Sequence, residues 1–273
     1  YEQAQWYYKR ALDYRGENPL LYRDYAISLI YLEQMDEAER LLKEAEEKGM
    51  AQSDIFMVQG ELERAFGNYE EAVSCFSKVL AETEDNYMRE RAYIIASKAF
   101  ADIGTKEALL MDTEWLKEAA KELPMSRRLL IYERLAEEYI TLGELTSQPA
   151  YYEQAVTTLQ GIVEMGWDTF LTYSNIVVLY QRISDMEAAR MWAEKMCERY
   201  PEQYASYMRL AFTELEQQST KPENERDYEN FAGYYKKALE RYKKQTSGNI
   251  TNSEMQLLEN AYQQLTDGGW LKE

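Results

Sequence analysis

Apolar residues recur along this chain at an interval of 34 residues. Ala4, Ala38 and Ala72 stand at this interval, each after a glutamate or glutamine, and Ala155 and Ala189 repeat it later. A large apolar side chain follows four residues after each of the first three alanines, and a smaller one three residues further on. These pairs are Tyr8 and Ala11, Leu42 and Ala45, and Phe76 and Val79. Residues so spaced share one face of an α-helix, so the pattern predicts a repeated amphipathic helix, here called the B-type helix.

A second helical pattern lies between the B-type helices. Mostly large apolar residues stand at offsets 0, 3, 7 and 10, and a small or aliphatic residue stands at offset 4. The clearest copies begin at Tyr22, Tyr93, Tyr132 and Tyr173. A small side chain at a helix contact lets the neighbouring helix approach closely. We call this element the A-type helix, and its alternation with the B-type helix predicts antiparallel helix hairpins.

Capping residues and glycines divide the pattern into separate helices. The expected N-caps are Asn18, Ser53, Ser126 and Ser253, with Pro19 as a first helical residue and Gln256 completing a capping box. The glycines expected to end helices are Gly16, Gly49 and Gly248. We therefore expect a B-type helix at 1–15 without an A-type partner, six hairpins, and a closing A-type helix at 252–266. The hairpins are expected at 19–48, 53–83, 87–123, 127–165, 169–200 and 203–244.

Composition agrees with an all-α protein of one continuous array over residues 1–273. Hydrophobic residues make up 45% of the chain and charged residues 29%, which argues against disorder. Only 12 glycines and 5 prolines are available for tight turns, so helices are favoured throughout. The longest uncharged stretch, residues 169–181, is 13 residues long, whereas a membrane span needs about 20 apolar residues. We therefore expect no membrane span and a cytoplasmic location.

The repeat resembles that of the tetratricopeptide repeat (TPR) family. Phe56, Gln59 and Gly60 match the first half of the family's 34-residue pattern, and Ala72 and Phe76 match the second half. Tyrosine replaces the expected tryptophan, and the late proline is kept only twice, at Pro124 and Pro201. The resemblance covers nearly the whole chain. It implies a right-handed superhelical solenoid of antiparallel helix hairpins, with a concave face lined mainly by A-type helices.

The expected function is a non-catalytic interaction scaffold that binds a peptide or another protein in its concave groove. The residues expected to line that groove are Arg23, Ile27, Tyr31, Met57, Arg64, Ile94, Lys98, Glu137, Arg182, Met208 and Phe212. Basic residues there would attract an extended peptide with carboxylates and an apolar anchor. The alternative is that these cations pair with acidic residues one helical turn away. Family members that grip a C-terminal carboxylate use lysine and asparagine, where this chain has Arg23, Ile27, Met57 and Glu61.

Charge and the chemical groups present exclude several other classes of function. The net charge is −18, which repels polyanions, so no nucleic acid is expected as a ligand. The chain has no histidine and two cysteines, so neither a metal site nor a cofactor is expected. Cys75 and Cys197 are expected to be reduced thiols packed between helices. An all-α glycosidase, which would need two nearby carboxylates, is a less favoured alternative.

Two further expectations concern the wider protein. The chain begins with Tyr1 rather than methionine, so we expect a fragment or processed form of a longer protein. The TPR resemblance implies that such arrays are often joined to signalling proteins, bacterial protein kinases among them, which makes a regulatory or sensor array an alternative function. The first helix would lack its A-type partner, and its exposed face predicts contact with an upstream repeat or a homodimer.

Overall fold

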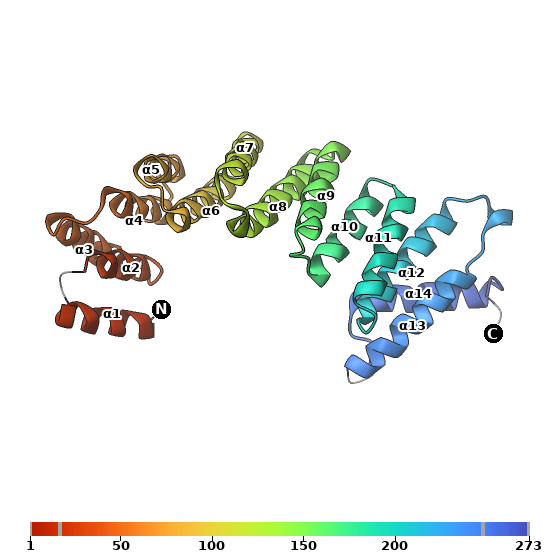
Figure 1. The fold of residues 1–273 in the computed structure, drawn as a ribbon. Helices are drawn as coiled ribbons and strands as arrows, with labels where there is room; N and C mark the ends of the chain where they lie inside the picture. Colours follow the sequence, from red (N-terminus) through yellow and green to blue (C-terminus); the bar gives the residue numbers. More distant parts are fainter. Residues whose placement is uncertain (1, 16–17, 247–248, 272–273) are drawn as a thin grey trace. The chain divides into compact units, whose positions relative to one another are not determined.

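The protein is helical in the part that the structure describes. The computed structural model describes residues 2–15, 18–246 and 249–271, and these residues form α-helices and two short 3-10 helices without any strand (Figure 1). They fall into two compact units, residues 1–145 and 146–273. The prediction of a single array across both units stays a prediction.

The first unit alternates B-type and A-type helices. Its helices are α1 (Glu2–Arg15), α2 (Pro19–Ile30), α3 (Met35–Glu47), α4 (Gln52–Ala65), α5 (Tyr69–Glu82), α6 (Asn86–Ile103), α7 (Lys106–Glu122) and α8 (Leu129–Thr146), with a 3-10 turn at Met125–Arg127. Helices α2 and α3, α4 and α5, and α6 and α7 pack as hairpins. The A-type helices α2, α4 and α6 also pack against one another in order. The apolar stripes of α2, α4 and α6 are therefore buried against neighbouring helices on both sides.

The second unit repeats the same arrangement. Its helices are α9 (Pro149–Glu164), α10 (Phe170–Arg182), α11 (Met186–Arg199), α12 (Tyr204–Ser219), α13 (Glu229–Gln245) and α14 (Ser253–Asp267), with a 3-10 turn at Glu223–Glu225. Helices α10 and α11 form one hairpin, and α12 and α13 form another. The A-type helix α14 packs against both α12 and α13, so it covers the apolar side of the last hairpin. Within the described residues, the helices begin and end within two residues of the predicted bounds. The prediction that α8 and α9 form the hairpin at 127–165 stays a prediction.

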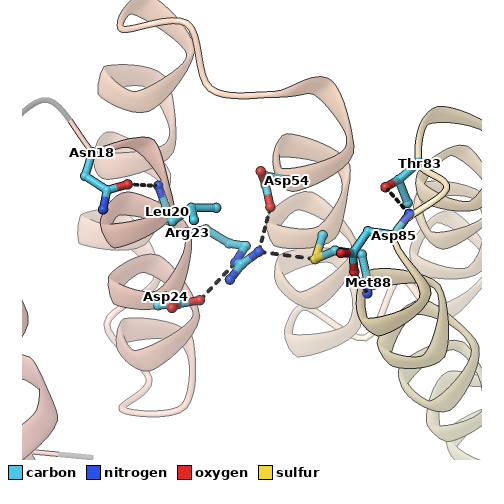
Figure 2. Close-up of polar contacts among 8 residues, drawn as sticks. All are labelled: Asn18, Leu20, Arg23, Asp24, Asp54, Thr83, Asp85 and Met88. Carbon is cyan, nitrogen blue, oxygen red and sulfur yellow. Dashed lines mark hydrogen bonds and ion pairs between the residues drawn. The ribbon is translucent and has the colours of Figure 1, made fainter. Parts of the chain in front are cut away.

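The capping predictions are partly right. The side chain of Asn18 accepts a hydrogen bond from the backbone N–H of Leu20, as Figure 2 shows. Gly49 follows α3 with a φ of 79°, the left-handed conformation that glycine adopts at little cost. Both predictions are therefore confirmed. The predictions for Gly16 and Gly248 lie outside the described residues.

The predictions of Ser53, Ser126 and Ser253 as N-caps are wrong, because the helices begin at other residues. Helix α4 begins before Ser53, with Ala51 at its N-cap. Ser126 lies in the 3-10 turn that precedes α8. At α14 the side chain of Asn252, one residue before Ser253, accepts the bond from the backbone N–H of Met255 at 3.0 Å.

A close contact between α4 and α5 explains the motif that carries the TPR resemblance. A Cβ atom added to Gly60 would lie 2.7 Å from two ring carbons of Phe76. Phe76 is fully buried, so its ring has no free space into which it can move. Glycine at this position therefore lets the two helices of the hairpin approach to the distance that buries the phenylalanine.

This contact predicts that Gly60→Ala lowers the stability of the protein. Alanine favours a helix over glycine by about 1 kcal/mol, but overpacking a rigid core costs about 1 to 3 kcal/mol, so we expect a net loss of about 1 kcal/mol. Urea unfolding followed by circular dichroism measures it. Gly233→Ala in α13 is the control, because an added Cβ there has no atom within 4 Å, and it should stabilise the protein. An equal stabilisation by both substitutions would contradict the packing argument.

Candidate functional site

Two open hollows join into one groove on the A-type helices of the first unit. Their volumes are about 400 Å³ and about 310 Å³. Tyr31, Tyr87 and Arg91 line both hollows, so the two are continuous. We call this surface the unit 1 groove. Its lining residues are Ala4, Tyr8, Asp24, Ile27, Ser28, Tyr31, Glu61, Tyr87, Glu90, Arg91, Ile94, Ile95, Lys98 and Leu130.

Four of the residues predicted from the sequence line the unit 1 groove. They are Ile27, Tyr31, Ile94 and Lys98. The sequence reasoning missed Arg91 and Tyr87, which continue the α6 face of Ile94 and Lys98 toward the N-terminus at helical spacing. Extending the repeat offsets by two turns before Ile94 would have found both residues.

Arg23 does not face the groove as a free cation, which corrects the prediction for this residue. Its guanidinium forms ion pairs with Asp24 at 2.9 Å and with Asp54 at 2.8 Å (Figure 2). It also donates a hydrogen bond to the sulfur of Met88 at 3.2 Å, and the side chain is buried. Arg23 of α2 therefore joins α4 and α6 to its own helix and is not available to a ligand carboxylate.

Met57 and Met208 lie in the two cores, not on a groove surface. Met57 is 0% exposed and Met208 is 2% exposed. Their helices, α4 and α12, each have an A-type helix on both sides, namely α2 and α6 for α4, and α10 and α14 for α12. The two flanking helices cover side chains that would be exposed on an A-type helix at the end of an array. The prediction that these methionines line the groove is therefore wrong.

Arg64 is paired within the first unit, as the alternative interpretation of the basic residues predicts. Its guanidinium lies 3.1 Å from Asp102 of α6 and 3.6 Å from Glu61 of its own helix. Glu61 lines the groove but is 1% exposed, and its second oxygen, Oε2, has no hydrogen-bond partner among the described residues. Burial raises the pKa of Glu61, and the nearby cations Arg64, Arg91 and Lys98 oppose this effect.

The remaining predicted residues lie at two other hollows. Glu137 lines a hollow of about 450 Å³ on α6, α7 and α8 and pairs with Arg134 at 2.9 Å. Arg182 and Phe212 line a hollow of about 440 Å³ in the second unit, on α10, α12 and α14. The guanidinium of Arg182 lies over the ring of Tyr152, 5.5 Å from its centre. Each unit therefore has its own surface hollow along its A-type helices.

A buried acid pair joins α7 to α8. Asp112 and Glu138 are both almost fully buried, and one oxygen of each has no hydrogen-bond partner among the described residues. The other oxygen of Asp112 accepts a bond from Ser97 at 2.7 Å, and that of Glu138 pairs with Arg134 at 2.6 Å. Burial and the neighbouring Glu138 raise the pKa of Asp112 to about 7. Neither carboxyl is open to a substrate, so this pair serves the packing of the helices.

Cys75 and Cys197 are free thiols, as predicted, and burial raises the pKa of both, that of Cys197 to about 12. No group of three or more potential metal-ligating side chains occurs in the described residues. Within the same residues, no helix has the length and apolar character required to cross a bilayer.

Helix α1 keeps aromatic side chains exposed. Trp6, Tyr7 and Tyr14 are 53%, 67% and 82% exposed, and the guanidinium of Arg10 lies 4.7 Å from the centre of the Trp6 ring. Tyr8 on another face of this helix stacks on Tyr25 of α2. Contact of α1 with a second copy or an upstream repeat stays a prediction.

The acid pair predicts a pH dependence of stability that Asp112→Asn removes. The folded protein holds a proton on Asp112 up to about pH 7, whereas the unfolded chain releases it near the usual value of 3.8. The free energy of unfolding should therefore fall as the pH rises from about 4 to 7, by on the order of 2 to 4 kcal/mol, and level off above. Thermal unfolding across this pH range measures the effect.

Asp112→Asn should flatten this curve, because the amide can donate to Glu138 and still accept from Ser97. Glu137→Gln is the control. Glu137 pairs with Arg134, which also pairs with Glu138, but Glu137 is exposed to solvent. A variant Asp112→Asn with the wild-type slope would show that another group titrates.

Comparison with known proteins supports the fold directly. No family model matches the sequence, and no curated protein matches it. Solved structures of similar fold include the following two. The C-terminal part of a TPR repeat-containing protein from Cytophaga hutchinsonii is 14% identical, with a TM-score of 0.58, and the match covers 80% of this chain and 78% of that one. The apo form of RapI is 16% identical, with a TM-score of 0.58, and the match covers 95% of this chain and 79% of that one. The all-α fold of stacked helix hairpins predicted from the repeat is thereby confirmed, and it is similar to the fold of these TPR-type structures.

Proposed function

We propose that this chain is a non-catalytic interaction scaffold that binds an extended peptide, or an extended segment of a partner protein, in the unit 1 groove. The observation that carries this proposal is the continuity of the two hollows through Tyr31, Tyr87 and Arg91. A repeat array presents an extended surface of this kind because each hairpin adds one A-type helix to it.

The chemistry of the groove suits a peptide. Ile94 and Leu130 offer apolar surface, and Leu130 is 51% exposed. A peptide supplies apolar side chains that can pack against this surface, and backbone groups that can bond to polar side chains of the lining. A few apolar anchors would dominate affinity, and the polar groups would set specificity.

The two alternative functions are a regulatory array and a glycosidase. A regulatory array within a signalling protein would use the same groove, with a neighbouring domain as its ligand. A glycosidase would need two accessible carboxylates, and Asp112 and Glu138 are buried between helices. The burial of this pair favours the scaffold over the enzyme.

A peptide-display experiment tests the proposal. A library of randomised eight-residue peptides is selected on the purified chain, and the affinity of enriched peptides is measured by fluorescence anisotropy. We expect Ile94→Gln combined with Leu130→Gln to weaken their binding at least tenfold, because both apolar anchors are lost. Circular dichroism checks that the variant is folded.

The matched control is Leu110→Gln combined with Met111→Gln, which changes two exposed apolar residues of the B-type helix α7. This control should bind the selected peptides as the wild type does. Enrichment of no peptide, or of peptides that bind the Ile94 and Leu130 variant normally, would contradict the unit 1 groove as the binding site.

A further inference from the structure

The carboxylates that line the unit 1 groove already have arginine partners. Asp24 pairs with Arg23 at 2.9 Å. Glu90 pairs with Arg127 at 2.6 Å, and Glu61 lies 3.6 Å from Arg64. The arginines in these pairs come from within the first unit and are held there by the fold. A basic ligand would therefore have to compete with existing ion pairs for every carboxylate in the lining.

The two other cations of the groove, Arg91 and Lys98, have no ion-pair partner in the part of the chain that the structure describes. Arg91 and Lys98 form neither a hydrogen bond nor an ion pair with any described residue, and the neighbouring carboxylate of Glu61 is buried and acts on them only through space. Arg91 lies near the ring of Tyr87, 5.8 Å from its centre, and Lys98 is exposed. Both lie on the groove face of α6 with Ile94 between them. They are the cations that a ligand can reach without breaking an ion pair.

From this arrangement we infer that the bound segment is acidic and carries two carboxylate side chains three residues apart, one for Arg91 and one for Lys98. The inference rests on the proposed function and deepens it. The two cations are seven residues apart on a helix, which corresponds to about 10 Å along its axis. An extended segment of the polyproline II type advances about 9 Å in three residues and returns its side chains to the same face. An apolar residue beside the two acids would meet Ile94 and Leu130.

Charge complementarity favours this occupant in particular. The chain as a whole carries a net charge of −18, which opposes the approach of a long polyanion. A short acidic segment is attracted only where cations are unpaired, so it would be directed to α6. The resulting charge-assisted hydrogen bonds give specificity and a dependence on salt concentration.

The peptide selection described above also tests this inference. We expect enriched peptides to contain glutamate or aspartate pairs three positions apart. Arg91→Gln combined with Lys98→Gln should weaken their binding at least tenfold at low salt and reduce the loss of affinity that the wild type shows between 50 and about 300 mM salt. Replacing both acids of a selected peptide by glutamine should have a similar effect on the wild type and little on the variant.

Arg40→Gln combined with Lys43→Gln is the matched control. It changes the net charge by the same amount, on exposed positions of the B-type helix α3, and should leave binding unchanged. A synthetic version of a selected peptide with phosphoserine in place of both acids distinguishes a carboxylate ligand from a phosphorylated one. Tighter binding of that peptide through Arg91 and Lys98 would overturn the assignment to carboxylates.

The outcomes separate this inference from the proposed function. Peptides that depend on Ile94 and Leu130 but lack acidic pairs, or that bind the Arg91 and Lys98 variant normally, would overturn the inference and leave the groove as the binding site. Failure to select any peptide that depends on Ile94 and Leu130 would overturn the proposed function itself.

Discussion

Arginine side chains that reach from one A-type helix to the next hold the A-type helices of each unit together. Arg23 joins α2 to α4, and Arg64 joins α4 to α6. Arg134 of α8 reaches Ser97 of α6, and Arg209 of α12 reaches both Ser174 of α10 and Glu254 of α14. Apolar packing between helices tolerates small shifts, whereas these bonds are satisfied in few arrangements. Removing one partner of a buried ion pair costs about 3 to 5 kcal/mol, so the buried Arg23–Asp54 pair strongly selects one register of α2 against α4.

This use of arginine in the fold decides which charged groups of the groove are left without an ion pair. Arg23 and Arg64, two basic residues that the sequence predicts in the groove, form ion pairs with acidic residues of neighbouring helices. Their charges are therefore already neutralised within the protein. Arg91 and Lys98 are the exceptions on α6. The charged groups that the groove leaves without an ion pair are thus those that remain after the A-type helices have been joined to one another.

The fold could be predicted from the sequence because the size and period of apolar residues decide helix pairing. Ala72, Phe76 and Gly60 illustrate this, since the contact that the motif implies is present in the structure. The groove was harder to predict. Met57 and Met208 stand at positions that point outward on an isolated A-type helix, but neighbours on both sides bury them. The pairing of Arg23 and the lack of an ion pair between Arg91 and any described residue depend on which residues distant in sequence meet, which the repeat offsets do not contain.

Helix α6 carries its packing contacts and its groove residues on different faces. Met88 accepts the bond from Arg23, and Ser97 joins Asp112 of α7 and Arg134 of α8, so these two residues serve packing. Arg91, Ile94 and Lys98 lie on the face between them and contact the groove. Because successive faces of a helix are set by different residues, substitutions on the groove face leave the bonds of the packing face intact. The residues of the groove face can therefore change without changing the way the hairpins stack.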